Sequence, residues 1–442
     1  MKKKKLIKLA IALSLIAVVL FISYVYISPI YNKELINSID VKSYDNKTKI
    51  IKLEIKFKKT YPYTYCKIKG SKIKINNNTC TLELTEKDIN NIYLTRGPIK
   101  RKISVENLVL NIEIPKKVYL AKGETYKLNP VIDTINSTAE IEYKSDNEKI
   151  ISVSKNIVKA NKTGTSSVSI YLNGKKQKSI EFEVTNLISK RTKKINNEKP
   201  YLPCNVYTEE EAKKLDEILE NRIENVGGYK TRAAVVEAIR FLTLDLKYKI
   251  DYFFENGRIT GGMHYADGEG RYYHKGLYLH DYKKKSIESS YAGPAIWGCP
   301  LKNFEDYPPK YRSNSYNNNG LDCSGFVSWA ILNGGFDVGD KGAGDNLEDD
   351  TELNDVGDKV ELTDELMKSG KVKAGDIVGI WGHIAIIAGI DSENAYVAES
   401  LWTYGGVVVN TYKLDELDEE FVQVTLMDKV YKKDGKYTNI WY

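Results

Sequence analysis

Three polar residues near the end of this chain have the types and surroundings that nucleophilic chemistry needs. Cys323 lies in NNNGLDCSGFVSWAILNGG, where the apolar residues after it recur at helical spacing, so the thiol falls in the first turn of a predicted helix. Unpaired backbone N–H groups and the helix dipole favour an anion there. The sequence therefore predicts a lowered thiol pKa and a place to hold an oxyanion. A buried structural cysteine is the alternative.

His383 and Glu399 are the candidate partners of this thiol. KAGDIVGIWGHIAIIAGI indicates two strands joined by a tight turn at Trp381-Gly382, and His383 opens the second strand. Glu399 closes the next predicted strand, AYVAE. A carboxylate beside an imidazole orients the ring and stabilises its charged form. We therefore predict Cys323 as nucleophile, His383 as base and Glu399 as the orienting group, with no metal and no cofactor.

An α+β region, residues 203–442, must position these groups. Thr208 and Glu211 form a capping box before a run of apolar residues at helical spacing, and a second predicted helix begins near Thr231. Helices followed by strands indicate an α+β domain. The polar, basic segment before it, residues 188–202, is predicted to be a linker.

Residues 40–187 alternate apolar and polar side chains between turn signals. KIIKLEIKF (49–57) and CTLELT (80–85) predict half-buried strands, and SVSIYLNGKKQKSIEFEV predicts a hairpin around Asn173-Gly174. Short strands at regular spacing favour β-sandwiches. We expect one β-rich domain over 40–103 and a second over 104–187.

The first thirty residues have the composition of an export signal. Residues 1–8 carry five lysines and are predicted to stay in the cytoplasm, which accounts for part of the formal net charge of +7. Residues 9–30 form a run without charged side chains. The length of this run is nearer to the ~20 residues of a spanning helix than to the shorter apolar region of a cleaved signal. We expect a transmembrane anchor there, with a cleaved signal and secretion to the cell wall as the alternative. The remaining charge is spread thinly, so no nucleic-acid partner is expected.

An odd cysteine count outside the cytoplasm implies pairs and one free thiol. Cys66 and Cys80 flank a strand-rich stretch and are predicted to close a hairpin, while Cys204 and Cys299 are the second candidate pair. Cys323 then stays unpaired. The alternative is that all five cysteines are reduced.

Residues 104–187 resemble a bacterial Ig-like domain of group 2. The resemblance rests on AKGETYKL, then EYKSDNEKIISVSKN, then NKTGTSSVSIYL, in the order found in that family. Tyr143 stands where the family usually has Trp. The resemblance implies an all-β sandwich that acts as a spacer or as a wall-binding module.

The C-terminal motifs resemble the NlpC (NlpC/p-sixty) family of papain-like cell-wall cysteine peptidases. Asp322-Cys323-Ser324-Gly325-Phe326 matches the family's helix start, Gly375-Asp376 its strand start, and His383 the opening of its next strand. The resemblance implies hydrolysis of peptidoglycan stem peptides by a thiol protease, which the N-terminal segment would hold at the membrane and outside the cytoplasm. Glu399 replaces the His common at the third position, so an N-acetylmuramoyl-L-alanine amidase is an alternative, and a non-catalytic wall-binding or adhesion protein is another.

The same resemblance suggests residues that contact substrate. It gives Asp322 a contact with a substrate amine, for which capping the helix is an equal alternative. Ser324 follows the nucleophile, and Tyr291 and Trp297 stand where the family places pocket aromatics. Three further histidines upstream lack metal-ligand spacing, so substrate-groove or surface roles are expected for them. The acidic stretch 345–358 lacks calcium-loop spacing, so a solvated loop is expected there.

Overall fold

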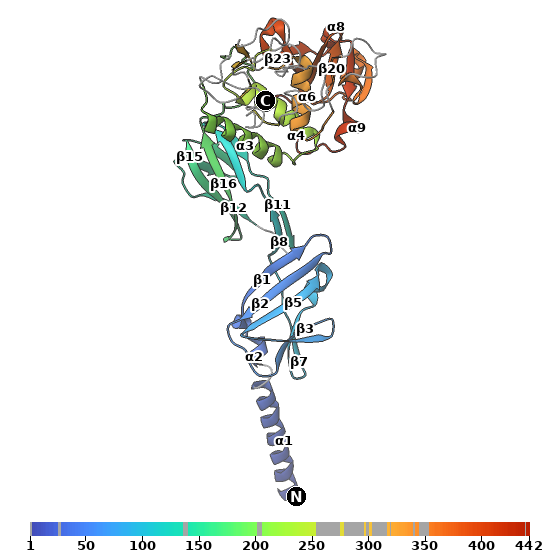
Figure 1. Ribbon diagram of the computed structural model, residues 1–442. Coiled ribbons are helices and arrows are strands. Elements are labelled where there is room, and N and C mark those ends of the chain that lie inside the picture. Colours follow the sequence, from blue (N-terminus) through green and yellow to red (C-terminus); the bar gives the residue numbers. More distant parts are fainter. Residues whose placement is uncertain are drawn as a thin grey trace. The chain divides into compact units, whose positions relative to one another are not determined.

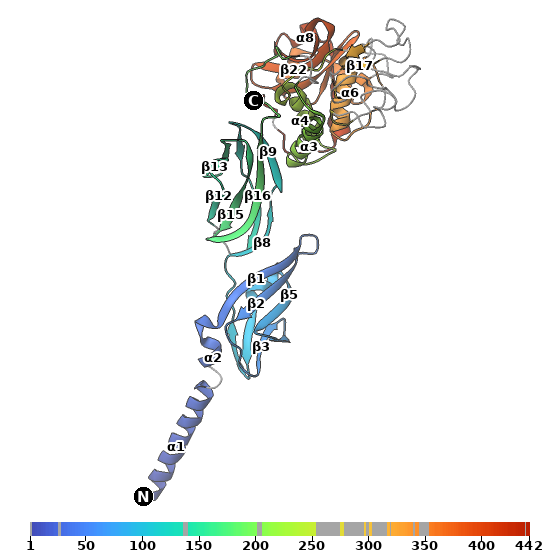
Figure 2. The ribbon, with the colours of Figure 1, turned by 60° about the vertical axis from the view of Figure 1, so that its left-hand side comes forward.

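The chain forms two compact units, each described separately below. Unit 1 comprises Met1–Ile114, Leu128–Lys144 and Ser169–Ser179; unit 2 comprises Pro115–Lys127, Ser145–Val168 and Ile180–Tyr442. The computed structural model (Figures 1 and 2) describes residues 2–24, 28–135, 140–200, 206–252, 275–277, 296–297, 300–302, 316–318, 320–338, 341–343, 353–437 and 439–442.

The N-terminal apolar segment forms helix α1, Lys2–Ile22, which includes the four lysines Lys2–Lys5 and ends well before residue 30. Two short helical turns follow, α2 (Ser28–Tyr31) and η2 (Lys33–Leu35). Among the helices of the described residues, none combines the length and the apolar character that a membrane crossing needs. The prediction of a spanning helix over 9–30 is therefore not supported.

Unit 1 contains antiparallel sheets of short strands. The orders are β1-β2-β5 and β4-β3-β6-β7, and β8 pairs with β11. The elements up to β8 are β1 (Ile36–Asp45), β2 (Ile50–Phe57), β3 (Thr64–Ile68), β4 (Ser71–Lys74), β5 (Thr79–Thr85), η3 (Glu86–Asn91), β6 (Tyr93–Arg96), β7 (Ile99–Lys102) and β8 (Leu108–Glu113). The strands predicted at 49–57 and 80–85 are confirmed as β2 and β5.

A disulfide links the two larger sheets of unit 1. Every second residue of β2 and β5 is buried in one apolar core, as the alternating sequence predicts. Cys66 on β3 is bonded to Cys80 on β5, and both are fully buried. The predicted pair is confirmed, but it joins two sheets and does not close a hairpin. Cys204 and Cys299, the other predicted pair, lie outside the described residues.

Residues 104–187 form a second set of strands, which contributes to both units. Their sheet orders are β10-β14-β13 and β12-β15-β16-β9, with β16 parallel to β9. This β-rich region is compatible with the predicted Ig-like sandwich, and the hairpin at Asn173-Gly174 is confirmed. The strands are β9 (Lys117–Ala121), β10 (Thr125–Lys127), β11 (Val131–Ile135), β12 (Ile141–Ser145), β13 (Ile151–Ser154), β14 (Ile157–Ala160), β15 (Gly164–Leu172) and β16 (Lys175–Thr185).

The rest of unit 2 combines helices with an antiparallel sheet of order β19-β24-β20-β21-β22-β23. Its helical segments are α3 (Glu209–Asn225), α4 (Arg232–Arg240), the π-helix η5 (Phe241–Asp245), α6 (Cys323–Asn333), η8 (Leu353–Asp355), α7 (Asp364–Lys368), η9 (Trp402–Tyr404), α8 (Leu417–Glu420) and α9 (Asp428–Tyr431). Its strands are β17 (Pro300–Lys302), β18 (Tyr316–Asn318), β19 (Asp358–Glu361), β20 (Ile377–Ile380), β21 (His383–Ile390), β22 (Asn394–Leu401), β23 (Gly406–Lys413) and β24 (Gln423–Leu426).

Helix α6 lies at the centre of unit 2. It packs beside α4 and against β21 and β22, and α3 packs on both α4 and β9 (Figure 1). The predicted capping box starts α3: the Thr208 N–H donates to Glu211 at 2.8 Å, and the Glu211 N–H donates to Thr208 at 3.2 Å. Local capping and apolar spacing thus determine where helix α3 begins, and α3 in turn packs on α4, the helix beside α6.

The segment predicted as a linker, 188–202, is fixed to unit 2 over its described part. Arg191 is buried and donates to Asp245 at 2.7 Å and to Glu237 at 3.1 Å. Asn197 donates to the Val409 carbonyl at 2.9 Å. A polar composition resembles that of a free linker, but these partners, distant in sequence, hold the segment in place.

Candidate active site

Cys323 is the first residue of α6, as the sequence predicts. Asp322 is the N-cap in extended conformation, and its Oδ1 accepts the Gly325 N–H at 2.7 Å. The Ser324 hydroxyl donates to the same oxygen at 3.3 Å. Of the two roles considered for Asp322, helix capping is confirmed. Ser324 is buried against this cap, and its predicted substrate contact stays a prediction.

The thiol lies against the start of strand β21. The Ile384 backbone N–H points to Sγ, as do the N–H groups of Cys323 and Ser324. These donors favour a thiolate, but burial, and then the negative charge of Asp322, outweigh them and raise the pKa of Cys323 to about 12. The predicted lowering of this pKa is therefore wrong, because a desolvated sulfur beside a carboxylate costs more to ionise than the helix terminus recovers.

His383 and Glu399 meet through a direct hydrogen bond. His383 Nε2 lies 2.8 Å from Glu399 Oε2, which joins the first residue of β21 to the neighbouring strand β22. The Phe421 ring stacks on the imidazole with centroids 6.3 Å apart. Nδ1 of His383 is buried and has no hydrogen-bond partner among the described residues. One ring nitrogen is thus anchored, and the other stays available.

Two side chains of β23 hold the Glu399 carboxylate from the other side. Its Oε1 accepts from Asn410 Nδ2 at 2.7 Å and from the Tyr412 hydroxyl at 3.0 Å. Only 2% of Glu399 is exposed, so these donors replace solvent around the carboxylate. The sequence analysis missed Asn410, Tyr412 and Phe421. The one available signal was the period of two that places Asn410 and Tyr412 on a single face of their strand.

Backbone contacts bring the start of α6 next to the strand that carries Glu399. The Ser400 hydroxyl donates to the Leu321 carbonyl at 2.7 Å. The Leu321 N–H donates to the backbone carbonyl of Asp251, and Asp251 forms an isolated β-bridge with Gly406. A Cβ on Gly406 would lie 2.0 Å from the Ile250 carbonyl, so only glycine fits.

Tyr252, also absent from the sequence prediction, lies beside the nucleophile. Burial raises the pKa of its hydroxyl, and the charges of Asp322 and Cys323 add to the effect. Its ring packs edge-on against Trp402, with centroids 6.2 Å apart. Tyr252 therefore connects the start of α6 to the surface beyond β22.

The Gly375-Asp376 motif is a structural element. Asp376 is buried and accepts from Arg232 at 2.8 Å and from the backbone N–H groups of Lys373 and Met427. Gly375 has φ +90°, and its carbonyl accepts the Tyr431 hydroxyl. The motif fixes the entry to β20 and hence the turn before His383.

The two predicted pocket aromatics have different outcomes. Trp297 is fully buried, and its Nε1 donates to the Gly276 carbonyl at 3.1 Å, so the ring has a packing role, and its substrate contact stays a prediction. Trp329 of α6 donates to the same carbonyl at 2.9 Å, which makes the pair a structural clamp. Tyr291 lies outside the described residues, as do the three upstream histidines, His264, His274 and His280.

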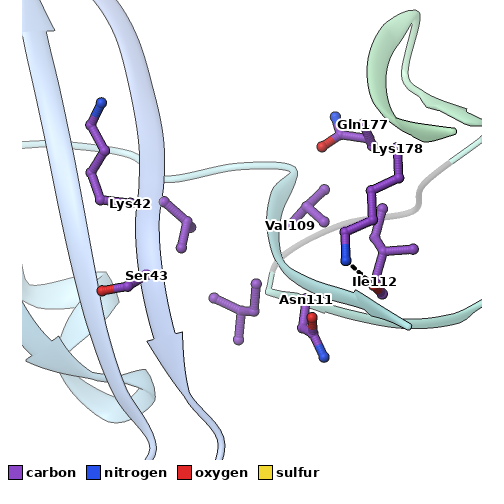
Figure 3. Close-up of a pocket in the computed structure, with 9 residues that line it drawn as sticks. Lys42, Ser43, Val109, Asn111, Ile112, Gln177 and Lys178 are labelled. Atoms are coloured by element: carbon purple, nitrogen blue, oxygen red, sulfur yellow. Dashed lines mark hydrogen bonds between the residues drawn. The ribbon is translucent and has the colours of Figure 1, made fainter. Parts of the chain in front are cut away.

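A pocket of about 170 Å³ belongs to unit 1 and has neither a cysteine nor a histidine among its lining residues (Figure 3). Both of its lysines are engaged: Lys178 donates to the Ile112 carbonyl at 2.6 Å, and Lys42 pairs with Glu54 at 2.9 Å. The three residues for which the sequence predicts chemistry, Cys323, His383 and Glu399, are in unit 2.

Comparisons with known proteins assign no family. No family model matches the chain, and no curated protein matches it. Among solved structures, it is similar to a C-terminal 282-residue fragment of intimin in complex with the intimin-binding domain of the translocated intimin receptor. That likeness has 15% identity and a TM-score of 0.20, covering 42% of this chain and 78% of the other. It is too low to assign fold or function.

Proposed function

We propose that unit 2 is a papain-like cysteine hydrolase that cleaves peptidoglycan stem peptides. Two observations support the proposal together. Cys323 Sγ lies at a helix start beside the N–H of Ile384, the residue that follows His383. Glu399 holds Nε2 of His383 at 2.8 Å, while Nδ1 of the same ring has no hydrogen-bond partner in the described part of the chain. A nucleophile, a base and an orienting group are the parts that acyl transfer needs.

The hydrogen bond to Glu399 sets the tautomer of the base. An ionised carboxylate only accepts, so Nε2 carries the proton and Nδ1 keeps its lone pair. The stacked Phe421 fixes the ring plane. Nδ1 is therefore the atom that takes the thiol proton, and Glu399 stabilises the imidazolium that forms.

The raised pKa of Cys323 assigns the proton transfer to the attack itself. The resting thiol is neutral, and His383 removes its proton as Sγ bonds to the substrate carbonyl carbon. The N–H groups at the start of α6 face this position and stabilise the tetrahedral oxyanion. His383 then protonates the leaving amine, and water attacks the thioester to release the carboxylic acid and restore the thiol.

A second candidate reaction is hydrolysis of the amide between muramic acid and the peptide. The hydrogen bond between His383 and Glu399 favours this reaction, because the resemblance links a glutamate at the third position to the amidase relatives. Mass spectrometry of digested peptidoglycan separates the two reactions, because stem-peptide cleavage leaves part of the peptide on the sugar and amidase cleavage releases it whole.

An extracytoplasmic location is part of the proposal. The Cys66–Cys80 disulfide in unit 1 supports it, because structural disulfides form and persist in oxidising compartments. Cys323 is the one free thiol among the described cysteines. The Ig-like region is proposed as a spacer or wall-binding module.

The test is release of soluble fragments from purified peptidoglycan by the full chain and by Cys323→Ala. Loss of the nucleophile should lower the rate by at least about 10³-fold, while circular dichroism and the unfolding midpoint stay unchanged. Ser328→Ala is the matched control further along α6, where the buried hydroxyl has no hydrogen-bond partner among the described residues, and it should keep most of the activity. Full activity in Cys323→Ala would refute the mechanism.

A further inference from the structure

Two exposed tryptophans stand apart from the other three in the chain. Trp381 is 77% exposed and Trp402 is 76% exposed, whereas Trp297, Trp329 and Trp441 are buried. Tryptophan is among the most costly side chains to leave in water and is enriched at binding hot spots. The exposure of these two rings therefore needs an explanation, and their position in the fold supplies one.

Both rings lie at the edge of the sheet that carries the candidate active site. Strands β21 and β22 are antiparallel neighbours, so the start of β21 at His383 and the end of β22 at Leu401 lie at the same end of the two strands, which we call the edge. Trp381 lies in the turn just before His383, and Trp402 directly follows Leu401. Trp402 also contacts Tyr252, which lies beside Asp322 and Cys323. The two rings therefore flank the catalytic candidates.

The charge of this edge limits what the rings can bind. From residue 374 to residue 412, which includes the three hairpins of β20 to β23, there is no Lys or Arg. Lys249 reaches this stretch from elsewhere in the chain, but it is buried and its Nζ donates to the Tyr404 carbonyl at 2.9 Å. An anionic lipid surface or a polyanion would be held by such cations. Flat apolar faces, each with a single N–H donor at the rim, match a neutral ring that has apolar C–H faces and polar edges. A pyranose sugar has this form.

We propose that Trp381 and Trp402 form a sugar-binding platform that holds the glycan strand next to the peptide being cleaved. This inference rests on the proposed hydrolase and names the part of the substrate that it recognises beyond the peptide. It makes the preferred substrate a stem peptide still attached to its sugar. Free stem peptides lack the group that the platform binds.

Binding is tested on the full chain carrying Cys323→Ala, so that no turnover occurs. A soluble N-acetylglucosamine oligomer should change the indole fluorescence saturably, and Trp381→Ala and Trp402→Ala should each weaken the affinity about tenfold. Tyr229→Ala removes a partly exposed aromatic ring elsewhere in unit 2, 39% exposed, and should leave the affinity unchanged. Equal affinity in all variants, or no response to the sugar, overturns the platform.

Activity provides the second arm. In the active protein, Trp402→Ala should raise KM about tenfold for stem peptide linked to glycan and leave KM for free stem peptide unchanged. An equal rise in KM for both substrates would show that Trp402 contacts the peptide, and it would overturn the proposal. Binding of the protein to anionic vesicles but not to the sugar would overturn it as well. Sugar binding without any hydrolysis would refute the proposed function and leave the platform standing.

Discussion

Unit 1 and unit 2 bury different kinds of groups. The described core of unit 1 is apolar and contains the disulfide between Cys66 and Cys80. Its buried charged side chains among the described residues are Asp88 and Arg96. Unit 2 buries many charged side chains in pairs and clusters: Arg191, Arg232, Glu237, Arg240, Asp245, Asp376 and Glu399. Buried charges add little net stability even when paired, but they fix the geometry of what surrounds them. The contrast indicates that the core of unit 1 mainly supplies stability, whereas the buried charges of unit 2 fix the positions of polar groups.

Within unit 2, two polar clusters differ in how completely they are paired. The Arg191 cluster, consisting of Arg191, Glu237 and Asp245, pairs one guanidinium with two carboxylates. His383 pairs one nitrogen with Glu399 and leaves the other without a partner among the described residues. The Arg191 cluster is therefore fully paired and has a structural role. The His383–Glu399 pair leaves Nδ1 of His383 able to accept a proton.

Breaking the Arg191 cluster should have the largest effect on stability. Arg191→Met removes the guanidinium that is hydrogen-bonded to both buried carboxylates and leaves Asp245 its longer contact with Arg222 at 3.5 Å, so we expect the free energy of unfolding to fall by about 3–5 kcal/mol. Denaturant unfolding followed by near-UV circular dichroism measures the change. Lys190→Met, at the exposed neighbouring position, should stay within about 0.5 kcal/mol of the native protein.

The same cluster has a pH signature. Burial alone would raise the pKa of Glu237, but the charge of Arg191 outweighs it and holds this pKa below its usual value. Its contribution to stability is therefore present above about pH 4.3, the ordinary pKa of Glu, and is lost as the pH falls through the lower folded value. If Arg191→Met were as stable as the native protein at pH 7, the cluster would not have the structural role described here.

Removing the disulfide should sharpen the contrast between the units. Replacing Cys66 and Cys80 by Ala opens a loop with a sequence separation of 14 and should destabilise unit 1 by about 3 kcal/mol. Hydrogen exchange should accelerate in β3 and β5, while exchange in α6 and the hydrolytic rate stay unchanged. Loss of protection in α6 in this variant would show that the units do not keep their stabilities separate.

Local patterns predicted the elements that carry the site. The capping box at Thr208, the helix that begins at Cys323, the Trp381-Gly382 turn and the strand opened by His383 were all visible, because caps, turns and periodicity act over a few residues. The alternating strands of unit 1 were visible for the same reason.

Properties that depend on distant residues were not visible. Arg191 looked like part of a solvated linker because its carboxylate partners come 46 and 54 residues later. Trp297 looked like a pocket aromatic because a sequence pattern does not give the burial of a single ring. The thiol pKa was predicted from the helix terminus alone, whereas burial, which only the fold supplies, decides its direction.

The smallest expected effect concerns the ionisation of Cys323 itself. Because burial and Asp322 raise its pKa to about 12, alkylation by iodoacetamide should be slow at pH 7 and rise about tenfold per pH unit, without a plateau below about pH 10. Mass spectrometry of the peptide that contains Cys323 measures the rate. Asp322→Asn keeps a side chain able to cap the helix but removes the negative charge, so it should shift the profile to lower pH. A plateau reached already near pH 7, abolished by His383→Ala, would instead show a preformed thiolate–imidazolium pair and would place the proton transfer before substrate binds.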